Sequence, residues 1–449
     1  MQTSFTPEQL IDPEIAVADT ILRKCVHCGF CTATCPTYVL LGDELDSPRG
    51  RIYLIKNMLE RGEPATAETV KHIDRCLSCL ACMTTCPSGV HYMHLVDQAR
   101  AHIERTYQRP LVDRLLRNML AWIMPRRSLF RAALQLARFA RPFRALTAAL
   151  GLKPAATMLD LVPRRVPETE TIGRPGVYPA ESRRRARVAL LRGCVQSVLD
   201  PAINAAAIRL LNRHGIEVVV TEGEDCCGSI THHMGKEMDA LARARRSIDA
   251  WLKADVEAVI VTASGCGTTI KDYGHMLRLD AAYAEKARRV SGMARDITEY
   301  LVTLALPKIG APLPLTVAYH SACSMQHGQN IRTEPKALLT AAGFAVKDVP
   351  EGHLCCGSAG TYNILQSEIA THLRERKIAN IESTRPHVIA TGNIGCITQI
   401  GGGTPIPILH TIELLDWAYG GPKPHALRDL PSAMSSPEDF PAGWEGRES

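Results

Sequence analysis

Eight of the sixteen cysteines fall into two groups of identical spacing near the N-terminus. Each group reads Cys-x₂-Cys-x₂-Cys-x₃-Cys-Pro, first at Cys25, Cys28, Cys31, Cys35 and Pro36, and then at Cys76, Cys79, Cys82, Cys86 and Pro87. Three thiolates spaced in this way can surround one face of an Fe₄S₄ cube, with the intervening backbone N–H groups aimed at its sulfurs. The spacing therefore predicts two [4Fe–4S] clusters, whose chemistry is the transfer of single electrons.

The pattern is the one that bacterial ferredoxins use, in which the fourth cysteine of each group completes the other cube. We therefore assign one cluster to Cys25, Cys28, Cys31 and Cys86. The other cluster takes Cys76, Cys79, Cys82 and Cys35. Structural zinc is the alternative, but zinc needs only four ligands per site and leaves the doubled pattern unexplained.

The other eight cysteines form two further groups with no cysteine left over. These groups are Cys194, Cys226, Cys227, Cys266 and Cys323, Cys355, Cys356, Cys396. Corresponding cysteines are offset by 129 residues at the first position and at the adjacent pair, and by 130 at the last. Such constant offsets indicate an internal duplication, and adjacent cysteines followed by glycine can both ligate a metal.

Each copy resembles the cysteine-rich CCG domain of heterodisulfide reductase and related proteins. The fullest form of that domain supplies a fifth cysteine, but Ala263 and Asn393 occupy its place here. Three interpretations stay open: a further [4Fe–4S] cluster in one or both copies, a metal-free thiol site, or a packing or docking module. His320, His327 and His353 lie near these cysteines, and we interpret them as hydrogen-bonding neighbours rather than ligands.

The elements that position these cysteines differ between the two halves of the chain. The residues between the first two groups, from Ile52 to Leu59, have helical periodicity, which favours an α-helical ferredoxin domain over a small β-rich one. In both copies of the repeat, short β-branched runs alternate with helix-like stretches such as Pro201–Arg213 and Ser367–Ile381. This alternation predicts two α/β units with mainly parallel sheets, whose cysteines follow the strand ends.

The predicted fold is therefore a multidomain chain. It comprises a two-cluster ferredoxin domain at 1–108, a basic amphipathic helical segment at 109–165, a first CCG unit at 186–305, a second CCG unit at 312–420 and a disordered tail at 426–449. A linker rich in Pro, Arg, Glu and Gly is expected at 163–185. In the basic segment we expect two or three short helices, interrupted at Pro125 and Pro142.

Charge is concentrated in that segment. The stretch 105–165 carries 13 Arg or Lys against two acids, although the whole chain has a net charge of only +6. An Arg-rich helix with Trp122, Phe130 and Phe143 among its apolar residues can lie on an anionic membrane surface, and the alternative is a docking or core-packing helix. The sparse aromatic residues argue against nucleic-acid binding.

The remaining composition excludes several classes. The N-terminus has no signal-peptide pattern and the chain has no apolar run near 18 residues, so a cytoplasmic protein is expected, with peripheral contact at the inner face of the cytoplasmic membrane as a further expectation. Neither G-x-G-x-x-G after a strand nor a P-loop occurs, so nucleotide or flavin binding is not expected. We assign no catalytic residue.

Two ferredoxin motifs followed by two CCG units make the chain similar to the iron–sulfur subunits of glycolate oxidase. The segments Ser47–Leu54 and Leu354–Asn363 carry the same resemblance. It implies a non-catalytic subunit that accepts electrons from flavoprotein subunits and passes them toward a quinone or another acceptor.

Other functions remain open at this point. The iron–sulfur subunits of anaerobic glycerol-3-phosphate dehydrogenase and of lactate utilisation share the cysteines. A thiol–disulfide reductase acting at the CCG sites is a different class, against which the missing fifth cysteine argues. An iron–sulfur regulator is a third class, for which no DNA-binding motif is present.

Overall fold

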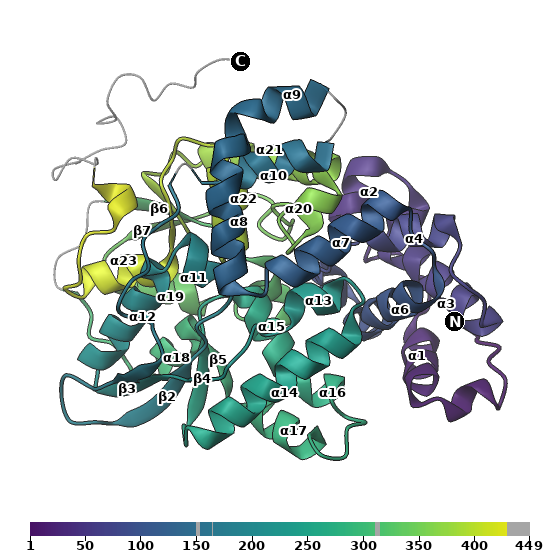
Figure 1. Ribbon diagram of the computed structural model, residues 1–449, viewed down its shortest axis with the longest axis horizontal. Coiled ribbons are helices and arrows are strands. Elements are labelled where there is room, and N and C mark those ends of the chain that lie inside the picture. The colour runs from purple at the N-terminus through teal and green to yellow at the C-terminus, as the bar shows by residue number, and fades with distance from the viewer. Residues whose placement is uncertain (150–152, 164, 310–314, 429–449) are drawn as a thin grey trace.

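The computed structural model describes residues 1–149, 153–163, 165–309 and 315–428. The N-terminal helices lie at one end of the long axis, and two α/β units fill the other end (Figure 1). This arrangement confirms the predicted fold class. Single turns of helix occur at η1 (Gln9–Ile11), η2 (Glu44–Asp46), η3 (Arg141–Phe143), η4 (Ser324–Gly328) and η5 (His425–Leu427).

The N-terminal part is helical, as the spacing between the cysteine groups predicts. Its helices are α1 (Pro13–Lys24), α2 (Pro36–Leu41), α3 (Pro48–Arg61), α4 (Ala67–Asp74), α5 (Ala81–Thr85) and α6 (Tyr92–Thr106). Proline opens α1, α2 and α3, where its missing N–H costs no hydrogen bond. The Ser47 hydroxyl caps α3 by accepting the N–H of Gly50 at 2.9 Å. Ile55 and Leu95 are fully buried where α3 packs on α6.

The basic segment forms more helices than the two or three expected. Its described part contains α7 (Leu111–Ile123), α8 (Arg127–Ala140), α9 (Arg144–Ala149) and α10 (Lys153–Leu161). Pro125 separates α7 from α8 and Pro142 lies in η3, so both interruptions are where the sequence predicts them. α8 contacts the first α/β unit and α10 contacts the second, so the segment bridges both units.

The two α/β units have matching sheets. The strands are β1 (Gly176–Tyr178), β2 (Ala186–Leu190), β3 (Ile216–Val220), β4 (Ala258–Val261) and β5 (Ala294–Asp296), followed by β6 (Thr316–Tyr319), β7 (Ala345–Asp348), β8 (Val388–Thr391) and β9 (Ile408–His410). The first sheet has the order β1-β3-β2-β4-β5 and the second β7-β6-β8-β9. Every pairing is parallel except that of the edge strand β1 with β3. β1 lies in the expected linker, so the first sheet begins before residue 186.

Helices follow the strands in both units. In the first unit they are α11 (Gln196–Leu199), α12 (Ala202–Arg213), α13 (Ser229–His233), α14 (Glu237–Lys253), α15 (Ser264–Lys271), α16 (Tyr273–Met276), α17 (Ala284–Met293) and α18 (Ile297–Thr303). In the second they are α19 (Glu334–Ala341), α20 (Tyr362–Leu365), α21 (Ser367–Glu382), α22 (Ile394–Gly401) and α23 (Thr411–Ala418). α12 and α21 coincide with the two helix-like stretches predicted from the sequence.

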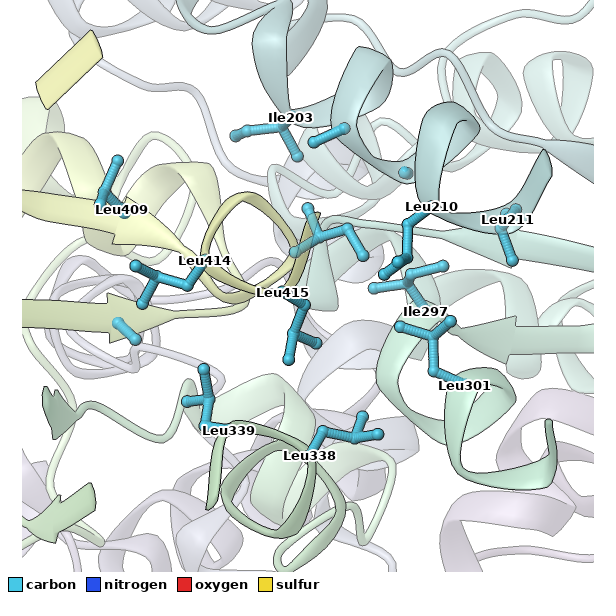
Figure 2. Packing of buried hydrophobic residues seen from close by; sticks show 14 of the residues in the cluster. Ile203, Leu210, Leu211, Ile297, Leu301, Leu338, Leu339, Leu409, Leu414 and Leu415 are labelled. Atoms are coloured by element: carbon cyan, nitrogen blue, oxygen red, sulfur yellow. The ribbon is translucent and has the colours of Figure 1, made fainter. Parts of the chain in front are cut away.

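One apolar core joins the two units. Leu210 and Leu301 of the first unit face Leu339 and Leu415 of the second (Figure 2). Arg209 and Arg213 of α12 add ion pairs across the boundary to the buried carboxylate of Asp416 in α23, at 2.6 and 2.9 Å. The units therefore form one body, and their cysteine-bearing strand ends are held at fixed positions.

The tail predicted at 426–449 lies outside the described residues from 429 onward. Within the described residues, no helix has both the length and the apolar character needed to cross a bilayer.

Candidate iron–sulfur centres

The two N-terminal cysteine loops share one backbone path. The second residue after the first cysteine is left-handed in both, with φ of 54° at His27 and 49° at Ser78. The fourth residue is also left-handed, with φ of 83° at Gly29 and 64° at Leu80. Leucine adopts this conformation only at a cost of about 1–3 kcal/mol. The same curl in both loops, despite that cost, indicates that the loops hold the same kind of ligand.

The first candidate centre lies in the loop that starts at Cys25. A small cavity of about 30 Å³ is lined by Cys25, Cys28, Cys31 and Cys86, the four residues assigned to one cluster, and Cys82 also contacts it. Burial, followed by the charge of Cys25, raises the pKa of Cys31 to about 11. Its thiol is therefore protonated when no metal is present, and metal binding releases that proton. On the rim of this site, Val26 and Phe30 are about two-thirds exposed, at 66% and 65%.

The second candidate centre surrounds Cys35, Cys76, Cys79 and Cys82. Burial is the main factor that raises the pKa of Cys79 and of Cys82. The phenol of Tyr92 donates to the Cys76 sulfur at 3.6 Å, and the Ser78 backbone N–H lies 3.5 Å from the same sulfur. Hydrogen bonds of this kind favour a thiolate and therefore fit a cluster.

A buried arginine stands beside this second centre. Arg51 in α3 is 1% exposed, and its Nη1 donates to the Cys35 sulfur at 3.7 Å. Its remaining N–H groups donate to the His72 carbonyl at 2.7 Å, to the Thr37 hydroxyl at 3.0 Å and to the Asp46 carboxylate at 3.2 Å. Buried charge is tolerated only where it is paired, and here a carboxylate and a cluster ligand share the role. The sequence analysis noted the segment that contains Arg51 only as a family resemblance.

The cysteines of the two α/β units all lie at the carboxyl ends of parallel strands. Cys194 follows β2, the pair Cys226 and Cys227 follows β3, and Cys266 lies in the first turn of α15 after β4. The second unit repeats this placement after β6, β7 and β8. This is the sheet edge where open α/β folds place their binding sites, as the sequence predicts.

The glycine after each cysteine pair has a specific role. Gly228 and Gly357 have φ of 84° and 87°, in the left-handed region that favours glycine. A Cβ atom would lie 3.0 Å from the Ala240 carbonyl oxygen at Gly228, and 2.5 Å from the Ala370 carbonyl oxygen at Gly357. The glycine therefore lets the helix after each unit's cysteine pair pack closely behind it.

All eight of these cysteines meet at one cavity of about 190 Å³. They are Cys194, Cys226, Cys227, Cys266, Cys323, Cys355, Cys356 and Cys396. The cavity also reaches Cys79, and Ala263 and Asn393 line it at the positions of the absent fifth cysteines. All sixteen cysteines lie in the described residues and all are free thiols. Thiols gathered in this way, with largely apolar walls, are a donor set that fits iron–sulfur chemistry.

The two groups of thiols differ electrostatically. In the first unit, the Cys194 and Cys226 sulfurs are 3.3 Å apart, and hydrogen bonds from Cys194 and Cys227 lower the pKa of Cys226. In the second unit, the hydrogen bond with Cys355 and then burial raise the pKa of Cys323. One thiolate is therefore favoured in the first unit before any metal binds.

The second ferredoxin motif packs directly against the second α/β unit. Leu77 and Cys79 belong to the same apolar cluster as Cys323 and Cys355. The Tyr362 hydroxyl donates to the Arg75 carbonyl at 3.0 Å, and the Thr84 hydroxyl lies 2.8 Å from Nδ1 of His327. The sequence does not predict this contact, because no local pattern indicates which domain faces which.

The basic segment serves as a docking element and also exposes apolar side chains. Arg109 and Arg117 pair with Asp74 of α4 at 2.7 and 2.8 Å, which fixes α7 to the ferredoxin part. Along α7–α9, large apolar side chains remain exposed at Leu111, Val112, Leu115, Met119, Trp122, Leu136, Phe139, Phe143 and Leu146. The docking interpretation therefore holds for α7, and the exposed apolar residues are left without a partner in the described chain.

Comparisons with known proteins agree with this organisation. A family model described as "4Fe-4S dicluster domain" matches residues 21–90, and one described as "Cysteine-rich domain" matches 188–271 and again 317–401. The "Glycolate oxidase iron-sulfur subunit" of Escherichia coli (strain K12) is 44% identical over 93% of this chain and 99% of its own length. The "Probable glycolate oxidase iron-sulfur subunit" of Bacillus subtilis (strain 168) is 30% identical over 89% and 94%. "Lactate utilization protein A" of Bacillus licheniformis is 30% identical, but over only 51% of this chain.

Proposed function

Because the chain belongs to the family of glycolate oxidase iron–sulfur subunits, we propose that it carries electrons away from a flavoprotein partner that oxidises glycolate. It is an electron-transfer iron–sulfur subunit of an oxidoreductase complex. A flavin removes two electrons from the substrate as a hydride, whereas iron–sulfur clusters accept electrons singly. The chain itself would then be non-catalytic and would divide each pair of electrons into two single steps.

The proposed route runs from the surface to the interior. Electrons would enter at the cluster of Cys25, Cys28, Cys31 and Cys86, whose rim is exposed. They would pass to the cluster of Cys35, Cys76, Cys79 and Cys82, and then to a centre in the cavity between the two α/β units. One observation carries this proposal: Cys79 and all eight cysteines of the α/β units line the same cavity.

A membrane surface is the proposed site of electron delivery to a quinone. Phe139 and Leu136 on α8 are 80% and 71% exposed, and arginines lie among these apolar residues on the same helices. The same helix supplies Arg127 and Arg131 to an open cleft of about 660 Å³. Apolar side chains flanked by arginine favour contact with an anionic lipid surface.

The membrane proposal has a direct test. Vesicles containing anionic lipid should bind the protein, and Phe139→Ser should weaken that binding several-fold. Met238→Ser removes an equally exposed apolar side chain, 74% exposed, from α14 and should leave binding unchanged. Equal binding to neutral vesicles, or equal loss in both variants, would contradict the proposal.

The number of centres is tested by analysis of iron and acid-labile sulfide in protein purified without oxygen. Two ferredoxin clusters require about eight irons per chain. We expect about twelve or more, because the cavity supplies two further sets of four thiols. A value near eight would mean that the α/β units hold no cluster.

The substrate is tested with the partner subunits present. The complex should be purified through this chain, and its iron–sulfur signals followed after glycolate is added. Bleaching by glycolate, with slower or no bleaching by lactate or glycerol 3-phosphate, supports the proposal. Preferential bleaching by glycerol 3-phosphate would move the chain to the alternative complex.

A further inference from the structure

The second α/β unit contains a buried histidine with no hydrogen-bond partner for its ring. His320 directly follows β6, its side chain is fully buried, and its backbone N–H donates to the Ala390 carbonyl at 2.9 Å. Neither Nδ1 nor Nε2 has a partner in the structure. Leaving a buried polar group unpaired costs about 1–3 kcal/mol. This finding corrects the interpretation of His320 as a hydrogen-bonding neighbour; His327, by contrast, is hydrogen-bonded to Thr84.

The ring of His320 faces two of the cavity cysteines. One ring nitrogen and the sulfurs of Cys356 and Cys396 all lie within 4.8 Å of one another, and the two sulfurs are 3.5 Å apart. The nitrogen makes no hydrogen bond to either sulfur. Metal–nitrogen and metal–sulfur bonds of about 2.0 and 2.3 Å place donors of one metal ion between about 3 and 4 Å apart. The spacing therefore suits a metal ion between the three groups, with small side-chain adjustments.

The first unit does not offer this donor. The duplication offset of 129 residues places Leu191 at the position of His320, and Leu191 is 2% exposed. The same offset pairs Lys377, which is 2% exposed, with Ile248, which is fully buried. The Lys377 Nζ donates to the Glu351 carbonyl at 2.8 Å. Two apolar positions of the first unit are therefore nitrogen bases in the second.

We propose that His320 ligates an iron of the centre that Cys323, Cys355, Cys356 and Cys396 hold, which makes the two α/β units inequivalent. The inference rests on the proposed function, in that the second unit must hold a cluster. A neutral imidazole in place of a thiolate makes a centre less negative, and such centres have higher reduction potentials. Lys377 acts in the same direction. Electrons arriving from Cys79 would therefore settle in the second unit before the first.

The test uses the full chain with ¹⁵N-labelled histidine, purified without oxygen and reduced. Pulsed electron paramagnetic resonance should detect one strongly coupled histidine nitrogen on an iron–sulfur centre in the wild-type protein. His320→Leu should abolish that coupling, since leucine already occupies the equivalent site in the first unit. His353→Gln, which alters an exposed side chain nearby, should retain it.

The outcomes separate this inference from the proposed function. An iron content of about twelve or more without a strongly coupled histidine nitrogen overturns the role of His320 and leaves the proposed function standing. An iron content near eight removes the centre itself and overturns both. Zinc bound at this site in place of iron also overturns the inference. The wild-type spectrum alone decides the question if His320→Leu fails to fold.

Discussion

Replacing Arg51 with methionine should lower the reduction potential of the second ferredoxin cluster. The guanidinium lies 3.7 Å from the Cys35 sulfur. Two unit charges about 4 Å apart interact by about 4 kcal/mol at an effective dielectric constant of 20. The added electron spreads over the cube and Asp46 offsets part of the field, so we expect roughly 1–3 kcal/mol, or about 50–120 mV.

The assay is a redox titration followed by electron paramagnetic resonance. Arg51→Lys keeps the charge and should retain most of the potential, which separates charge from packing. Arg61→Met removes an exposed arginine from the same helix and should cause no shift. If Arg51→Met assembles its full complement of iron and titrates at the wild-type potential, the electrostatic reasoning is refuted.

Three further predictions concern stability. Gly357→Ala should cost several kcal/mol, because its Cβ would lie 2.5 Å from a carbonyl oxygen of α21, whereas Gly223→Ala, also left-handed but in open space, should cost about 1 kcal/mol in urea unfolding. Gly50→Ala should prevent assembly of the ferredoxin part, because its Cβ would lie 2.0 Å from a carbonyl oxygen of η2; normal iron content would contradict this. Burial raises the pKa of Asp296 to about 6, so this carboxyl should reduce stability as pH rises from about 4 through 6. Asp296→Asn should flatten the dependence of unfolding free energy on pH by about 1–2 kcal/mol between pH 5 and pH 7.5, and an unchanged slope would contradict it.

The sequence predicted what depends on local spacing. The cysteine motifs, the helix between them and the parallel strands before Cys194 and Cys323 follow from residue periodicity and duplication. The helix α12, which the pattern at Pro201–Arg213 predicts, begins within one residue of that range. These features are recoverable because each depends on neighbours in the chain.

What the sequence did not predict depends on contacts between distant segments. β1 is only three residues long, and the edge of an existing sheet decides that it is a strand. The meeting of Cys79 with Cys323 depends on how the ferredoxin part docks. The unpaired ring of His320 is visible only once its surroundings are placed, although the leucine at the equivalent position 191 was a signal available in the repeat.

The core shared by the two α/β units also constrains how the protein is made. Leu414 and Leu415 of α23 belong to that core, so its walls cannot close until nearly the whole chain has left the ribosome. Cys194 is translated long before Cys396 and must remain reduced while it waits. Maturation of the inner centre is therefore a late step in biogenesis, in which delivery of iron and sulfide precedes or accompanies the final collapse of the two halves onto each other.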